Sequence, residues 1–111
     1  MVYSITINLS ARLLTLYGDG AAMRTFSVGI GKKNTPTPTG VYYIANKTPN
    51  PGGPFGVMWM GLNIAHYGIH GTNNPSSIGK IVSHGCIRMY NSDVLALARI
   101  VPIGTPVKIQ S

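Results

Sequence analysis

Apolar and polar residues alternate over the first part of the chain, which is the pattern of β-strands with one buried face. The alternation runs over residues 3–9 and resumes over 12–17 after a short turn. Gly18-Asp19-Gly20 is a strong turn signal, and a third apolar stretch follows over residues 22–30. The chain is therefore expected to begin as β-hairpins.

The middle of the chain alternates between β-rich segments and loops. The loops are expected at residues 31–40 and 48–56, because closely spaced Pro and Gly favour turns and extended backbone over regular elements. β-Branched and aromatic residues predict three more strands, over 41–45, 57–60 and 63–70. The last of these would deliver His70 at its end.

One helix is expected late in the chain. Asn91 or Ser92 is suited to its N-cap, and Asp93 lies in the first turn, where the helix dipole favours an anion. Apolar residues then recur at helical spacing as far as Val101, and Pro102 ends the helix.

Two smaller elements complete the pattern. A short helical turn is expected near residues 74–79, and alternation over 105–110 predicts a closing strand. A chain of 111 residues has the length of one domain, so residues 1–111 are interpreted as a single, mainly β domain with one helix. We expect it to be a monomer.

Charge narrows the range of partners. Nine Lys and Arg stand against two Asp and no Glu, which gives a formal charge of +7 and favours anionic partners such as wall polymers or peptide carboxylates. Apart from Lys32-Lys33 the basic residues are scattered singly, so nucleic acid is not expected. No apolar run is long enough to span a bilayer, and no signal peptide is visible; the first residues belong to the fold.

The candidate chemistry lies in a short window that ends at Arg88. Cys86, the only cysteine, follows His70 by 16 residues and His84 by two. A thiol must lose its proton before it attacks a carbonyl, and a neighbouring imidazole can accept that proton. In extended backbone, His84 and Cys86 would point in parallel, so His70 is the better base. The charge of Arg88 would favour the thiolate.

Three further roles follow from this pairing. The base needs an acceptor on its other nitrogen, and because Asp93 is explained as a helix-start residue, we expect the carbonyl of Gly71 to serve. Gly85 permits unusual backbone angles, so the N–H groups of Gly85 and Cys86 are the candidate oxyanion hole. Arg88 could pair with a substrate carboxylate.

The strings Ser83-His84-Gly85-Cys86-Ile87-Arg88 and Ile69-His70-Gly71 resemble the signature of the L,D-transpeptidase catalytic domain, or YkuD domain. The similarity extends through Gly71-Thr72-Asn73-Asn74-Pro75 and the Pro36 to Gly40 loop, so it covers nearly the whole chain. The resemblance implies a β-sandwich or barrel of mixed sheets.

The same resemblance implies a function. It predicts an enzyme that makes 3→3 peptidoglycan cross-links through a Cys86 thioester, with release of D-Ala from a stem tetrapeptide, outside the cytoplasm in the wall or spore envelope. His70 would be the base and the Gly71 carbonyl its orienter. Ser83, His84 and Gly85 would shape the substrate pocket. Many family members carry Asn where this chain has Arg88.

Other interpretations remain open at this level. The enzyme could be an L,D-carboxypeptidase, with water as the acceptor, or the domain could be a non-catalytic module that binds anionic wall polymer. His70, His84 and Cys86 are competent zinc ligands, but neither Asp is well placed to complete a hydrolytic zinc site and no Glu exists. No metal and no cofactor are expected.

Overall fold

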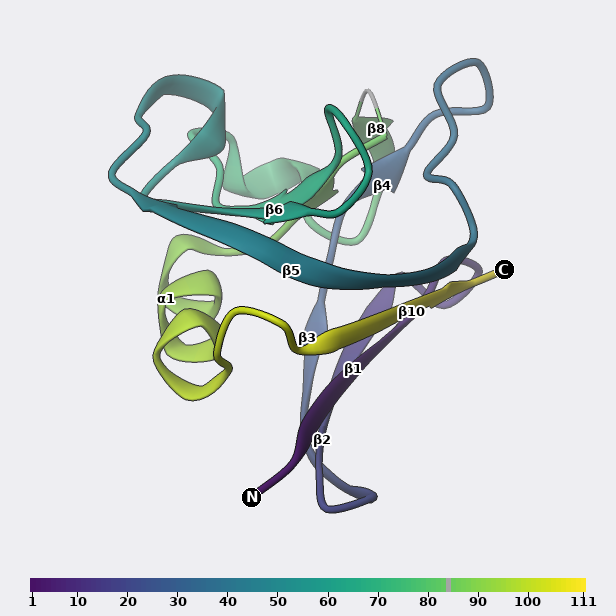
Figure 1. Cartoon of the computed structure of the whole chain (residues 1–111). Coiled ribbons are helices and arrows are strands. Elements are labelled where there is room, and N and C mark those ends of the chain that lie inside the picture. Colours follow the sequence, from purple (N-terminus) through teal and green to yellow (C-terminus); the bar gives the residue numbers. More distant parts are fainter. Residues whose placement is uncertain (84) are drawn as a thin grey trace.

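A curled, mixed eight-stranded sheet, in the order β3-β2-β1-β10-β5-β6-β7-β9, organises the computed structural model, which describes residues 1–83 and 85–111 (Figure 1). A second sheet pairs β4 with β8. The strands are β1 Tyr3–Asn8, β2 Leu13–Gly18, β3 Ala21–Ser27, β4 Ile30–Gly31, β5 Gly40–Pro49, β6 Met58–Leu62, β7 Gly68–His70, β8 Ile81–Ser83, β9 Ile87–Arg88 and β10 Pro106–Gln110. The helices are the short η1 Gly53–Phe55 and η2 Pro75–Ser77, and α1 Asn91–Ile100.

The first three strands form the expected hairpins. In the β1–β2 register Ile5 faces Leu16 and Ile7 faces Leu14, and all four side chains are buried. Alternate residues of a strand point to one side of the sheet, so the apolar positions found in the sequence build one face of the core.

Strand β5 joins the two parts of the sheet. Its first residues pair with β10, and residues from Ile44 onward pair with β6, with a shift in register between Ile44 and Asn46. Figure 1 shows β5 crossing the molecule between β10 and β6. The mainly β architecture of mixed sheets with one helix, predicted from the sequence, is confirmed.

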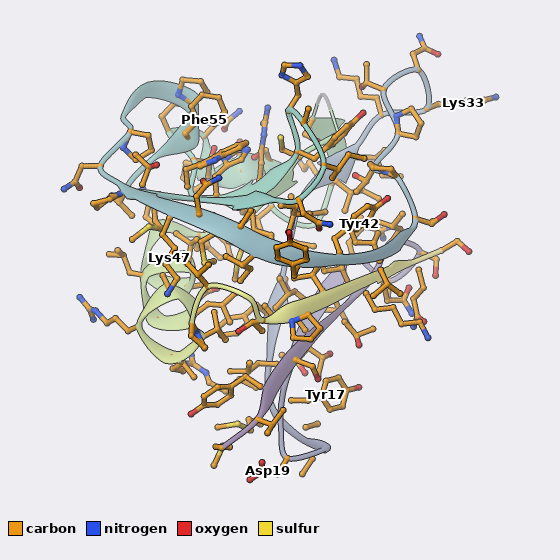
Figure 2. All side chains as sticks on the ribbon, viewed as in Figure 1. Tyr17, Asp19, Lys33, Tyr42, Lys47 and Phe55 are labelled. Carbon is orange, nitrogen blue, oxygen red and sulfur yellow. The ribbon has the colours of Figure 1, made fainter. Side chains whose placement is uncertain are left out.

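Helix α1 packs against β6 and β7 and buries Val94, Leu97 and Ala98. Its C-terminal end is held by the Lys47 ammonium, which reaches from β5 towards the helix and donates to the carbonyls of Ala98, at 2.8 Å, and of Val101 (Figure 2). A cation at this end also meets the negative end of the helix dipole.

The prediction that Asn91 or Ser92 is the N-cap of α1 is wrong. Tyr90 occupies that position without a capping side chain, and Asn91 is the first helical residue. The reason is a tertiary contact, because the side-chain oxygen of Asn91 accepts a hydrogen bond from the Thr72 N–H instead. Asp93 does lie in the first turn, as predicted.

Other boundaries also differ from the prediction. Residues 63–67 form the hairpin turn between β6 and β7, so the predicted strand over 63–70 is reduced to Gly68–His70. His66 adopts a left-handed φ of 72° in that turn. Strand β5 continues to Pro49, two residues into the predicted loop, because it pairs with β6. Within the described ranges, no helix has the length and apolar character needed to cross a membrane.

Candidate active site

Parallel pairing of β7 with β9 brings the two predicted catalytic segments together. Ile69 lies opposite Ile87 and His70 lies opposite Arg88. Cys86 directly precedes β9, so it sits beside the beginning of β7, while His70 ends that strand. The segments that carry His70 and Cys86 therefore lie on neighbouring strands, with His70 two register positions beyond the residue opposite Cys86.

The imidazole of His70 is fixed on several sides. Its side chain is 3% exposed, and Nδ1 lies 2.5 Å from the Gly71 carbonyl oxygen. Its ring stacks on the Trp59 indole at 5.6 Å between centroids, with an angle of 18° between planes. The Phe55 ring packs against it in a T-shaped arrangement, with 5.0 Å between centroids. A carbonyl can only accept, so Nδ1 carries the proton in this contact and Nε2 is left as an acceptor. The expected Gly71 contact is present.

The thiol of Cys86 is half-buried and points to a different partner from the one expected. It donates to the His66 carbonyl oxygen at 3.4 Å. Among residues 1–83 and 85–111 there is no hydrogen bond between this sulfur and the His70 ring. The hairpin turn that contains His66 therefore covers the sulfur on one side.

Burial favours the uncharged form of both His70 and Cys86. Burial lowers the pKa of His70, the hydrogen bond to Gly71 raises it, and the charge of Arg88 lowers it. Burial raises the pKa of Cys86, while a backbone hydrogen bond from Gly68 and the charge of Arg88 act in the opposite direction. The expected effect of Arg88 on the thiol is present, but burial outweighs it. For both groups the net shift is therefore towards the uncharged form.

Ser83 braces the loop that carries the cysteine. Its hydroxyl donates to the Cys86 carbonyl at 2.7 Å and accepts from the Gly85 N–H at 3.1 Å, and the side chain is 1% exposed. Both hydrogen bonds stay inside the loop, so Ser83 shapes the backbone around the sulfur and does not present its hydroxyl at the surface. The Gly85 N–H, expected in the oxyanion hole, already has an acceptor.

Gly85 has the unusual backbone that the sequence suggested. Its φ is +116°, and a Cβ at this position would lie 2.5 Å from the ring of Tyr67. The sequence did not single out Tyr67, whose ring lies beside Gly85 in the loop before Cys86. His84 falls outside the described residues, so its predicted part in the pocket rests on the sequence alone.

Arg88 is half-buried at the end of β9, where its main chain exchanges two hydrogen bonds with Gly29 at 2.8 and 2.9 Å. Its charge acts on both His70 and Cys86, as their pKa shifts show. A cation thus stands next to the site. In the described part of the chain, no three His, Cys, Asp or Glu side chains come together as a metal site.

Comparison with known proteins places the chain in a family. Residues 2–109 match the L,D-transpeptidase catalytic domain family, YkuD. The YkuD protein of Bacillus subtilis, which carries the name of an L,D-transpeptidase, is 56% identical over 107 residues, which are 96% of this chain and 65% of that protein. The similarly named YqjB of the same bacterium is 36% identical, over 95% of this chain and 69% of its own length.

Solved structures share the fold. The catalytic domain of the Enterococcus faecium L,D-transpeptidase, solved by NMR, superposes with a TM-score of 0.84 at 29% identity, over 97% of this chain and 96% of that one. An L,D-transpeptidase from Mycobacterium smegmatis gives a TM-score of 0.88 at 22% identity, over 98% of this chain and 58% of that one, which shows the fold alone.

The curled mixed sheet with one helix is the fold of L,D-transpeptidase catalytic domains. Since the family match spans residues 2–109, the chain belongs to the L,D-transpeptidase catalytic domain (YkuD) family, a family of cysteine-dependent acyltransferases that act on peptidoglycan peptides. The chain spans about two-thirds of the length of the YkuD relative, 65%.

Proposed function

We propose that residues 1–111 form one catalytic domain that makes 3→3 cross-links in peptidoglycan, with Cys86 as nucleophile and His70 as general base. The observation that carries the proposal is the β7–β9 pairing, which sets a buried, oriented imidazole beside the strand that follows the only cysteine. The family match over residues 2–109 supports the same reaction class.

The first half of the reaction forms a thioester. The Cys86 sulfur leaves its contact with the His66 carbonyl by rotation about the Cα–Cβ bond, and Nε2 of His70 takes its proton as the sulfur attacks the carbonyl carbon. The bond attacked joins the L-centre of the diamino acid to the terminal D-Ala of a stem tetrapeptide. The imidazolium returns the proton to the nitrogen of D-Ala, which leaves as the carbon–nitrogen bond breaks.

The second half transfers the acyl group. The side-chain amine of a neighbouring stem attacks the thioester carbon, His70 removes one of its protons, and the Cys86 sulfur leaves and regains a proton from the imidazolium. Burial raises the pKa of the resting thiol, which favours transfer of the proton during attack. His70 thus acts as a true general base.

Backbone and charge stabilise the developing oxyanion. The Cys86 N–H is the donor we assign first, and the Gly85 N–H joins it once it releases the Ser83 hydroxyl.

Arg88 orients a carboxylate of the donor stem through its planar guanidinium group. His84 completes the pocket wall, as the family pattern implies. The +7 charge attracts the protein to anionic wall polymers outside the cytoplasm, in the wall or the spore envelope.

The decisive experiment supplies a disaccharide tetrapeptide to the purified protein and follows the products by mass. Release of D-Ala with cross-linked dimers supports the proposal, whereas D-Ala with free tripeptide identifies an L,D-carboxypeptidase. Cys86→Ala should abolish both reactions. Retained activity in that variant would remove Cys86 from the mechanism.

A carbapenem gives a second readout that needs no substrate. An activated Cys86 should open the β-lactam and keep it as one mass adduct, and Cys86→Ala should show none because the chain has no other cysteine. A module that only binds wall polymer would hold the polymer and leave the β-lactam intact.

A further inference from the structure

Asn91 makes a contact that its position in the sequence does not suggest. Its Oδ1 accepts a hydrogen bond at 3.0 Å from the Thr72 N–H, 19 residues earlier in the chain. The residue is half-buried at the start of α1, and Tyr90 occupies the N-cap position. Asn91 therefore serves the segment after β7 rather than its own helix.

That segment holds the base. The Thr72 N–H and the Gly71 carbonyl belong to the same peptide unit, which is planar, so the direction of one group sets the direction of the other. The Gly71 carbonyl oxygen lies 2.5 Å from Nδ1 of His70. The peptide unit is thus held from both sides, by the imidazole on one and by Asn91 on the other.

The side chain of Asn91 replaces a main-chain acceptor at the point where the hydrogen bonds between β7 and β9 end. The His70 carbonyl accepts from the Met89 N–H at 2.8 Å. A continued parallel ladder would next offer the Thr72 N–H a main-chain carbonyl. The chain after Met89 turns into α1 instead, and the side-chain oxygen of Asn91 fills the place of that carbonyl.

Two glycines make room for the amide. A Cβ at Gly56 or at Gly71 would lie 2.2 Å from Asn91 Oδ1, which is closer than any side chain tolerates. The Gly71 N–H is fixed as well, by a 3.0 Å hydrogen bond to the Met58 carbonyl. The oxygen of Asn91 is therefore packed against main chain on several sides, and its position is set by the fold.

We propose that Asn91 is a positioning residue for His70: it holds the Gly71–Thr72 peptide so that the proton stays on Nδ1 and Nε2 remains the base. The consequence for catalysis rests on the function proposed above. The link from Asn91 to the imidazole does not, and it can be measured in the resting protein.

Three variants test the link. Asn91→Ala removes the acceptor, Asn91→Asp keeps an oxygen in its place, and Ser92→Asp puts the same charge on the next residue, which is exposed. Nitrogen-15 NMR of the labelled imidazole reads the tautomer of His70 without any substrate. Asn91→Ala should lose part of the Nδ1–H tautomer, and Asn91→Asp should retain it.

The kinetic effect should follow the same order. In the cross-linking assay kcat of Asn91→Ala should fall about tenfold or more with little change in KM, since an orienting group acts on the chemical step. Asn91→Asp should recover most of that loss. Ser92→Asp should behave like the parent protein, which excludes an effect of charge alone.

A titration of Asn91→Asp supplies a test that does not depend on whether Asn91→Ala folds. Protonation of the carboxylate introduced by Asn91→Asp weakens it as an acceptor, so the amide signal of Thr72 and the Nδ1 signal of His70 should shift together with this titration. In the Ser92→Asp control, neither signal should shift as the introduced carboxylate titrates. The proposal is overturned if only the Thr72 signal moves, or if Asn91→Ala keeps the parent tautomer and kcat. A parent protein that releases no D-Ala would refute the proposed function and leave the NMR result valid.

Discussion

Removal of the Ser83 hydroxyl measures how much its two hydrogen bonds stabilise the main chain of Gly85 and Cys86. Ser83→Ala removes an oxygen that accepts from the Gly85 N–H and donates to the Cys86 carbonyl. The side chain is 1% exposed and Gly85 is buried, so its N–H would be left without an acceptor away from water. The loop would lose both bonds at once.

The size of the effect follows from those two bonds. A buried polar group left unpaired costs about 1–3 kcal/mol. The Gly85 N–H falls in this range, and the carbonyl of half-buried Cys86 loses less because water can reach it. The free energy of unfolding should therefore drop by about 2–4 kcal/mol, which corresponds to roughly 9–17 °C in Tm for a chain of this size.

Urea and thermal unfolding measure this loss, and Ser77→Ala is the matched control. Ser77 is 3% exposed and its hydroxyl makes one hydrogen bond, at 2.7 Å, to the carbonyl of exposed Asn74, so loss of this hydroxyl should cost about 1 kcal/mol. If Ser83→Ala costs no more than Ser77→Ala, the bracing role is refuted. A raised KM at unchanged stability would instead make Ser83 a residue that contacts substrate.

Two further predictions concern stability. Burial lowers the pKa of His70, so the unfolded chain binds its proton more readily than the folded chain does. The contribution of His70 to stability should therefore be present above about pH 6.5 and be lost as the pH falls below that value. The Tm of the parent protein should decline over this range, and a His70→Gln variant whose Tm declines with the same slope would contradict the prediction. Lys47→Met removes the cation that donates to the carbonyls of Ala98 and Val101, so the free energy of unfolding should fall by about 1 kcal/mol. Denaturant unfolding measures this loss, with exposed Lys108→Met as the control. An equal loss in the two variants would disprove the capping role of Lys47.

Local sequence signals predicted most of the architecture. The alternation in β1 and β2 shows which side chains are buried, because period two is a property of the extended chain itself. Gly18-Asp19-Gly20 marks the turn through its backbone preferences, and Asp19 and Gly20 indeed have φ values of 51° and 83°. The neighbouring strands of the His70 and Cys86 segments agree with the proximity that the sequence window suggested, while a pairing of the two side chains stays a prediction.

Features that depend on tertiary contacts could not be read in this way. The residues from Asn63 to His70 are as β-rich as a strand, and only the pairing of β6 with β7 turns the chain at His66. Strand β9 is two residues long and exists through its partners. Asn91 suits an N-cap by residue type, yet its amide is used by a segment 19 residues away.

The direction in which the pKa of Cys86 shifts could not be predicted from local sequence either. The sequence reveals Arg88 beside Cys86, and its charge favours a thiolate as expected. How deeply the sulfur lies is a property of the assembled fold, and this burial decides the direction of the pKa shift.

The place of β10 in the sheet has a consequence for how the protein is made. This strand comes last in the sequence, yet it lies between β1 and β5 and connects the N-terminal hairpins to the part that carries the site. On the ribosome the two parts can form local hairpins, but the sheet that joins them through β10 cannot be completed until residues 106–110 have left the exit tunnel. A nascent chain that stalls before this point would hold His70 and Cys86 in an unfinished sheet, which β10 completes.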